Sequence, residues 1–139
     1  MKSLHSREGA LPDVGLLVVE DDFLLRTEMS EVLRDAGVDT VYACGTIGEA
    51  LAVLDHCEVA GAVLDVRVGS ESIAPVARRL VRQGTPFLFY TGQITGDRTT
   101  SEWPDSPVLS KPSRARLIVE TLADLLKRVP SEAAADRRT

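Results

Sequence analysis

Three acidic residues follow the first strongly apolar run of the chain. The stretch "LLVVEDDF" places Glu20, Asp21 and Asp22 directly after four apolar residues. Two carboxylates about 4 Å apart repel each other by about 4 kcal/mol at an effective dielectric constant of about 20, so this cluster requires compensation. A lysine or arginine from elsewhere in the chain, a divalent metal ion, or solvent around splayed side chains would each provide it.

Three further polar residues lie at the ends of short apolar runs. Asp65 follows "AVL", Thr91 ends "PFLFYT" and Lys111 follows "PVLS". Taken singly, each has an ordinary structural explanation as a turn residue, a backbone-bonding hydroxyl or a surface ion-pair partner. Together with the acidic cluster they offer carboxylates for Mg²⁺, and a hydroxyl and a cation for a phosphoryl oxygen. If they converge, the chemistry indicated is an aspartate that accepts phosphate.

The elements that position these residues are alternating strands and helices. Apolar runs of strand length alternate with stretches of helical period, which is typical of an α/β fold with a parallel sheet. The expected strands are 15–19, 39–44, 60–66, 86–91 and 107–110. The expected helices are about 22–36, 46–56, 71–83 and 113–129, with Thr46 and Ser113 as candidate N-caps.

Ligands of such sheets bind outside the carboxyl ends of the strands. In the flavodoxin-like strand order 2-1-3-4-5, the first and third strands are neighbours, so Asp21 and Asp65 converge.

The segment 92–107 breaks the alternation. A fourth helix is expected here, but "GQITGDRTTSEWPDSP" has no sustained apolar stripe and contains two glycines and two prolines. We therefore expect a fourth helix that is short or disordered, with at most one or two helical turns. Trp103 is expected to anchor this segment to the body of the domain, with contact to a partner as the alternative.

Composition narrows the function classes. At 139 residues the chain fits one domain, expected at 14–129 with flexible tails at 1–13 and 130–139. The net charge of −5 gives no electrostatic support for direct nucleic-acid binding. No apolar run is long enough for membrane insertion or resembles a signal peptide, which predicts a cytoplasmic protein. Cys44 and Cys57 are expected to be free thiols.

The four polar motifs together resemble those of response-regulator receiver domains. The resemblance covers about 14–129 and rests on "VVEDD", "VLDV", "YTG" and "SKP" in this order. Each string is weak alone, but each stands at the carboxyl end of an expected strand. The resemblance implies that Asp65 is the phosphoacceptor and that Mg²⁺ is the cofactor. Asp21 and Asp65 would bind the metal directly, with the backbone carbonyl of Arg67, and Glu20 would act through water.

The resemblance also implies roles for the remaining polar residues. Thr91 would hydrogen-bond the phosphoryl group and Lys111 would pair with it, and the bond between Lys111 and Pro112 would be cis. Asp22 lies outside the usual acidic pair and is expected to be solvated or to cap the following helix.

Three features depart from the family pattern. Receivers often carry an aromatic switch residue three positions before the lysine, where this chain has Val108. The common Met-Pro after the phosphoacceptor is replaced by "VRVGSES". The string "FYTGQ" and its helix-poor continuation resemble the receiver subgroup with a Phe-Ala-Thr-Gly-like motif, where order and disorder of 92–106 would carry the signal.

The predicted function is that of a stand-alone response regulator, because no output domain follows Val129. A histidine kinase or phosphotransfer protein would phosphorylate it, and it would act on an unidentified downstream protein or serve as a phosphate sink, with a homodimer possible. It would not be an enzyme in the ordinary sense, although it would supply the groups for its own phosphorylation and slow dephosphorylation.

Three other functions are alternatives to this prediction. An aspartyl phosphohydrolase usually requires an acid two residues after the nucleophile, where this chain has Arg67. A flavin domain would place phosphate against the acidic cluster, which would repel it. A docking module that is never phosphorylated would not need the acceptor, metal and lysine positions to be intact.

Overall fold

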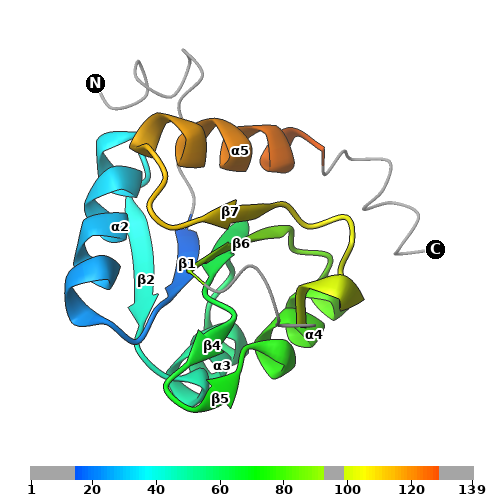
Figure 1. Ribbon diagram of the computed structural model, residues 1–139. Helices are drawn as coiled ribbons and strands as arrows, with labels where there is room; N and C mark the ends of the chain where they lie inside the picture. Colours follow the sequence, from blue (N-terminus) through cyan, green and yellow to red (C-terminus); the bar gives the residue numbers. More distant parts are fainter. Residues whose placement is uncertain (1–14, 93–98, 129–139) are drawn as a thin grey trace.

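The central element of the protein is a five-stranded parallel sheet. The computed structural model describes residues 15–92 and 99–128, so the tails expected at 1–13 and 130–139 lie outside the described residues (Figure 1). The strands run in the order β2-β1-β3-β6-β7, which confirms the expected flavodoxin-like order. Their bounds are β1 Gly15–Val19, β2 Thr40–Cys44, β3 Gly61–Leu64, β6 Phe87–Thr91 and β7 Val108–Ser110.

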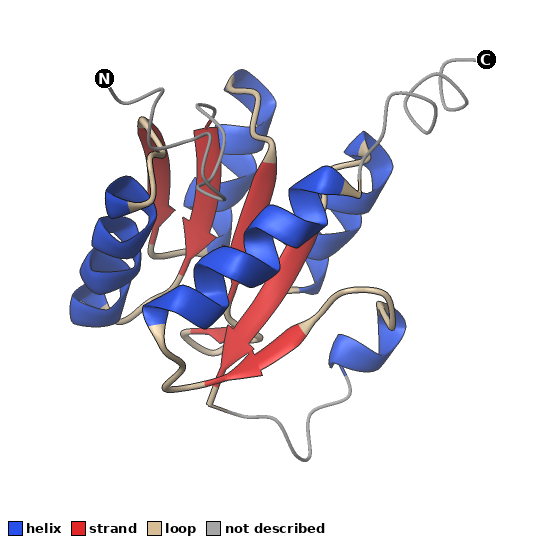
Figure 2. Ribbon diagram, turned by 90° about the horizontal axis from the view of Figure 1, so that it is seen from above, coloured by secondary structure: helices blue, strands red, loops and turns tan. Residues whose placement is uncertain are grey.

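Two helices cover each face of the sheet (Figure 2). The helices are α2 Phe23–Asp35, α3 Ile47–His56, α4 Ala74–Gln83 and α5 Ala115–Lys127. The apolar stripes of α3 and α4 pack on one face, and those of α2 and α5 pack on the other. None of the helices in the described residues is long and apolar enough to span a membrane.

The apolar character of β1 follows from its central position. Leu17 and Val19 point into the core beneath α3 and α4, whereas Leu16 and Val18 point into the core beneath α2 and α5. Because successive side chains of a strand alternate between the two faces, a strand covered on both sides must be apolar throughout. The polar residues of this segment therefore begin only where the strand ends, at Glu20.

Side-chain caps fix the start of two helices. Asp22 Oδ1 accepts a hydrogen bond from Leu25 N at 3.1 Å, and Thr46 Oγ1 accepts one from Glu49 N at 3.0 Å. Both caps were among the sequence predictions. The predicted cap of the last helix is wrong, because Ser113 lies one residue before the N-cap Arg114 and its hydroxyl donates instead to Ser110 O.

The loop after the third strand folds into a small antiparallel hairpin. It consists of β4 Arg67–Val68 and β5 Glu71–Ser72, with Gly69 in the turn at φ 64°. The sequence placed the start of the third helix at 71, whereas α4 begins at Ala74. Pro75 explains the difference, because a proline is tolerated in the first turn of a helix but not further along it.

A single short helix occupies the described part of the β6–β7 connection. This 3-10 helix, η1, spans Thr99–Glu102, and residues 93–98 of the connection lie outside the described residues. The Trp103 ring follows it and lies 6.3 Å, between centroids, from each of the Phe87 and Phe89 rings. Arg78 of α4 reaches Glu102 at 3.7 Å. Within the described part of this connection, the fourth helix is short, as predicted, and the anchoring role of Trp103 is confirmed.

Candidate functional site

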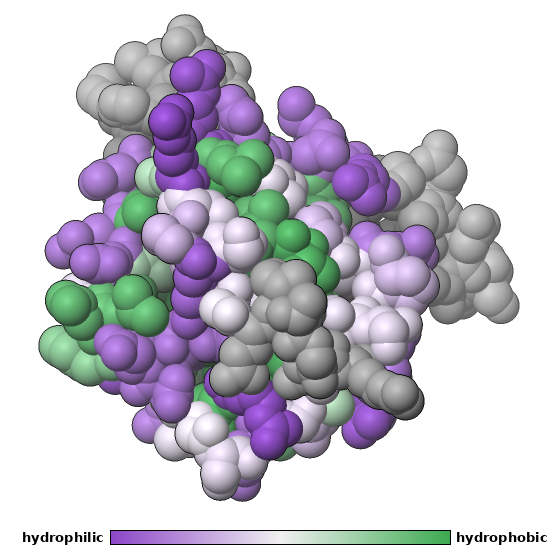
Figure 3. Space-filling model, viewed as in Figure 1, coloured by the Kyte–Doolittle hydropathy of each residue, from purple (hydrophilic) through white to green (hydrophobic). Residues whose placement is uncertain are grey.

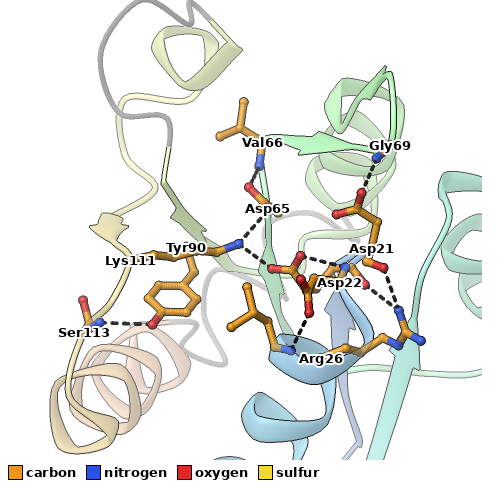
Figure 4. Close-up of polar contacts among 11 residues, drawn as sticks. Asp21, Asp22, Arg26, Asp65, Val66, Gly69, Tyr90, Lys111 and Ser113 are labelled. Carbon is orange, nitrogen blue, oxygen red and sulfur yellow. Dashed lines mark hydrogen bonds and ion pairs between the residues drawn. The ribbon is translucent and has the colours of Figure 1, made fainter.

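Three carboxylates meet at the carboxyl edge of the sheet (Figure 4). Glu20, Asp21 and Asp65 each present an oxygen, and these oxygens lie within 4.8 Å of one another. They meet because β1 pairs with β3 and Val19 lies opposite Leu64, so both strands end at the same level. Glu20 is buried, Asp65 is half-buried and Asp21 is exposed. The convergence expected from the strand order is therefore present.

Lys111 compensates part of this negative charge. Its Nζ lies 2.5 Å from Glu20 Oε1 and 2.8 Å from Asp65 Oδ2. The residue directly follows β7, and its peptide bond to Pro112 is cis, as the resemblance implied. A lysine or arginine was one of the three kinds of compensation expected for the acidic cluster. In the described residues, Lys111 provides it by bridging two of the three carboxylates.

Burial and pairing act in opposite directions on the pKa values of this pair. Burial raises the pKa of Glu20 above its usual value, although the hydrogen bonds from Lys111 and from the Asp22 amide act to lower it. Burial acts to lower the pKa of Lys111, but its hydrogen bonds to Asp65 and Glu20 outweigh this, so that pKa is raised. The lysine therefore carries its positive charge at neutral pH.

The two aspartates of the cluster are oriented by backbone amides. Asp21 Oδ2 accepts a hydrogen bond from Gly69 N at 2.9 Å, and Asp65 Oδ1 accepts one from Val66 N at 2.7 Å. The hairpin after β3 thus holds the carboxylate of Asp21. Arg67 begins this hairpin two residues after Asp65, and the predicted role of its backbone carbonyl stays a prediction.

Thr91 ends β6, the strand next to β3. Its exposed fraction is 1%, and its backbone carbonyl accepts a hydrogen bond from Lys111 N at 3.0 Å. The strands bring Thr91, Asp65 and Lys111 to one edge, because β6 lies between β3 and β7. All of the side chains predicted for the site therefore come from this edge of the sheet.

Sequence reasoning did not identify Arg26 as part of the site. Its guanidinium donates hydrogen bonds to the backbone carbonyls of Glu20, at 2.9 Å, and Asp21, at 3.4 Å. It also lies 5.4 Å from the centroid of the Phe23 ring. The one signal in the sequence was that Arg26 lies in the first turn after the acidic cluster. Because its guanidinium binds backbone carbonyl oxygens, the sequence contains no acidic side chain that would identify its partner.

Comparison with known proteins supports the class suggested by this geometry. No protein-family model and no curated protein sequence matches the chain. Among solved structures, SdrG from Sphingomonas melonis Fr1 is 32% identical, with a TM-score of 0.70 over 82% of this chain and 97% of that one. A response regulator receiver protein from Sinorhizobium medicae WSM419 is 24% identical, with a TM-score of 0.77 over 87% of this chain and 100% of that one.

A longer protein also contains this fold. The response regulator PhyR from Brucella abortus is 21% identical, with a TM-score of 0.76 over 94% of this chain but only 55% of that one. The sheet order, the acidic cluster with its lysine, and these neighbours define the class of receiver domains. The chain belongs to the response-regulator receiver family.

Proposed function

We propose that this protein accepts a phosphoryl group on Asp65 from the phosphohistidine of a histidine kinase or phosphotransfer protein. The receiver domain would span 14–129. The observation that supports this most directly is the position of Lys111 Nζ, 2.8 Å from Asp65 Oδ2 at the edge of the acidic cluster. A cation fixed beside a half-buried carboxylate is placed to stabilise a phosphoryl oxygen on that carboxylate.

In the proposed reaction, a carboxylate oxygen of Asp65 attacks the phosphorus atom. The new O–P bond forms as the P–N bond to the imidazole breaks, and the leaving nitrogen takes the bonding electron pair and then a proton from solvent. The product is an aspartyl phosphate. Lys111 would contact one phosphoryl oxygen and the hydroxyl of Thr91 would donate a hydrogen bond to another.

The acidic cluster fits a hard divalent cation such as Mg²⁺. Its donors are carboxylate oxygens, and they lie close enough together to share one ion. Asp21, Asp65 and the backbone carbonyl of Arg67 would hold the ion directly, and Glu20 would act through water. When bound, it would supply positive charge to the carboxylates and to the incoming phosphoryl group.

The output of the domain would be contact with another protein or withdrawal of phosphate from a kinase. Phe23 and Leu24 at the start of α2 are 71% and 62% exposed, and Figure 3 shows an apolar patch over that end of the helix. Exposed apolar patches suit contact with a partner protein. One structural neighbour, a PhyR mutant from Bartonella quintana, is described as an anti-anti-sigma factor, which makes a regulatory protein a reasonable downstream partner to test.

Phosphorylation is tested with Mg²⁺ and a small phosphodonor such as phosphoramidate. Intact-mass spectrometry should show the addition of one phosphoryl group that is released by hydroxylamine, as expected for an acyl phosphate. Asp65→Asn should abolish the adduct, because the amide is not a nucleophile of comparable strength. Asp124→Asn, at an exposed position on α5, is the matched control and should be phosphorylated normally.

A wild-type protein that gains no phosphoryl group would refute the proposal, and so would an adduct that persists in Asp65→Asn. Once acceptance is established, the cognate kinase is the one that phosphorylates the protein fastest among purified candidates. Proteins that co-purify only with the phosphorylated form would then identify the output.

A further inference from the structure

Tyr90 connects the edge of the sheet to the turn that carries Lys111. It lies on β6 directly before Thr91, and because strand side chains alternate, its ring points to the α2 and α5 side while Phe89 points to the other. Its hydroxyl oxygen accepts a hydrogen bond from Ser113 N at 3.0 Å (Figure 4). The segment from Lys111 to Ser113 is therefore tied to the neighbouring strand by a side chain.

The same ring lies against the ammonium of Lys111. Lys111 Nζ is 5.9 Å from the centroid of the Tyr90 ring, near the outer limit of a cation–π contact. Tyr90 thus contacts both ends of the short segment, the ammonium with its ring and the Ser113 amide with its hydroxyl. Of these two contacts, the hydrogen bond is the stronger restraint, because the ring contact is long.

Two hollows beside Tyr90 leave its ring partly unpacked. One is lined by Tyr90 together with Glu20 and Asp65 of the site. The other, of about 100 Å³, lies between α2 and α5 and is lined by Tyr90, Ser113 and Met29 among others. The hydrogen bond to Ser113 N therefore adds a specific restraint to a ring that packs on the core beneath α2 and α5.

No aromatic ring stands at Val108, the position where receivers often carry one. Val108 lies opposite Phe89 in the sheet and is 38% exposed. Among the described residues, an aromatic ring contacts the lysine from β6, on the α2 and α5 side of the sheet. Tyr90, which is adjacent in sequence to Thr91, contacts the turn that carries the lysine.

We propose that Tyr90 is a positioning residue for phosphoryl transfer, which acts by fixing the Lys111–Ser113 segment so that Lys111 Nζ stays beside Asp65. This inference rests on the proposed function of Asp65 and Lys111. Tyr90 itself does not contact the phosphoryl group. Its effect is transmitted through the peptide segment that its hydroxyl holds.

Tyr90→Phe tests the inference because it removes the hydroxyl and keeps the ring. With saturating Mg²⁺ and phosphoramidate, Asp65 should be phosphorylated about fivefold more slowly, the factor that corresponds to one ordinary hydrogen bond. Because the same hydrogen bond contributes about 1 kcal/mol to stability, the melting temperature should fall by no more than about 5 °C. Tyr42→Phe is the matched control, because Tyr42 lies on β2, the edge strand farthest from β7, and the loss of its hydroxyl should leave the rate unchanged.

A second measurement needs neither metal nor phosphodonor. In the ¹H–¹⁵N spectrum of the lysine ammonium groups, the Lys111 signal of Tyr90→Phe should move toward that of the exposed Lys127. If the Tyr90 ring served only to pack against the core, Tyr90→Phe, which keeps the ring, would leave both this signal and the phosphorylation rate unchanged. Tyr90→Leu, which also removes the ring, should move the signal further and slow phosphorylation more than Tyr90→Phe.

The two proposals fail in different ways. If wild-type Asp65 takes no phosphate, the proposed function is wrong, while the Lys111 signal still decides whether Tyr90 positions the lysine. If wild-type protein is phosphorylated and Tyr90→Phe matches it in both rate and Lys111 signal, the positioning role is overturned. A slower rate with a shifted signal, in a variant that stays folded at the assay temperature, supports it.

Discussion

Glu20 is a buried carboxylate whose negative charge is only partly compensated by its neighbours. It is 6% exposed, and it accepts hydrogen bonds from Lys111 Nζ and from the Asp22 amide. These two contacts do not fully replace the water that the carboxylate loses, because burial still raises its pKa. A second cation beside Glu20 would favour its ionised form, which is consistent with a metal ion at this edge of the sheet.

Replacing Glu20 by glutamine should therefore stabilise the metal-free protein near neutral pH. A raised pKa means that the folded protein binds a proton more readily than the unfolded chain, so the ionised carboxylate costs stability above that pKa. In chelator at pH 7, we expect the free energy of unfolding of Glu20→Gln to exceed that of wild type by up to about 1 kcal/mol. The excess should shrink as the pH falls through the raised pKa and the wild-type carboxyl becomes protonated.

Urea unfolding between pH 5 and 8, followed by the fluorescence of Trp103, measures this difference. Glu28→Gln on the exposed face of α2 is the control, and its stability should differ little from that of wild type. A variant Glu20→Gln that is less stable than wild type at every pH would show that the ion pair with Lys111 outweighs the cost of burial.

At the residue scale, the sequence predicted the side chains that meet at strand ends and two helix caps, and it missed Arg26 and Tyr90, which contact the backbone elsewhere. Glu20, Asp65 and Lys111 stand out because a charge after an apolar run has few packing explanations. Arg26 and Tyr90 bond a carbonyl and an amide, respectively, and every residue offers those groups. Such contacts involve no second side chain, so no complementary residue in the sequence reveals them.

At the scale of elements, the hairpin after β3 has the most direct connection to the site. Gly69 turns the chain at φ 64° and donates its amide to Asp21, so the turn and the orientation of the carboxylate depend on one residue. The sequence did not predict this hairpin, because strands of two residues are too short to show an alternating pattern. The longer strands and the four helices were predicted to within a few residues, because both faces of the sheet and one stripe of each helix are apolar.

Two glycine substitutions should have opposite effects on stability. Gly69→Ala should lower the free energy of unfolding by about 1 kcal/mol, because a side chain at positive φ clashes with its own backbone. A methyl group at Gly69 would otherwise meet no atom within 4 Å, so the conformation alone causes the loss. Gly48→Ala on α3 is the matched control, since it also enters open space and should raise stability by about 0.5 kcal/mol.

Thermal unfolding of both variants checks the signs, and Gly69→Asn should fall between Gly69→Ala and wild type because asparagine tolerates positive φ better. Gly69→Ala should also weaken Mg²⁺ binding, through the hydrogen bond to Asp21 Oδ2. If Gly69→Ala is as stable as wild type, the turn must accept another conformation.

At the scale of the whole molecule, the parallel sheet could be predicted because each βα unit carries its own signal, whereas the flavodoxin-like strand order was a hypothesis that the structure confirms. The order 2-1-3-4-5 then brings the ends of the first and third strands together, and the site follows from the fold. What could not be predicted is how charge is shared across the site. Lys111 bridges Glu20 and Asp65 across long sequence separations, at distances that depend on the packing of the whole sheet edge.

This sharing of charge predicts that Mg²⁺ stabilises the whole fold. Three carboxylates with one lysine leave net negative charge at the edge of the sheet, and an ion that binds only the folded state raises its stability by mass action. At a Mg²⁺ concentration of about 100 times Kd, the free energy of unfolding should rise by about 2.7 kcal/mol relative to chelator. Asp21→Asn should abolish most of this gain, because it removes a charged ligand that is not paired with Lys111, whereas Asp124→Asn should retain it.

Calorimetric scans in Mg²⁺, in chelator, and in K⁺ at matched ionic strength separate specific binding from screening. An equal gain in K⁺ would mean that the cluster attracts cations without forming a metal site.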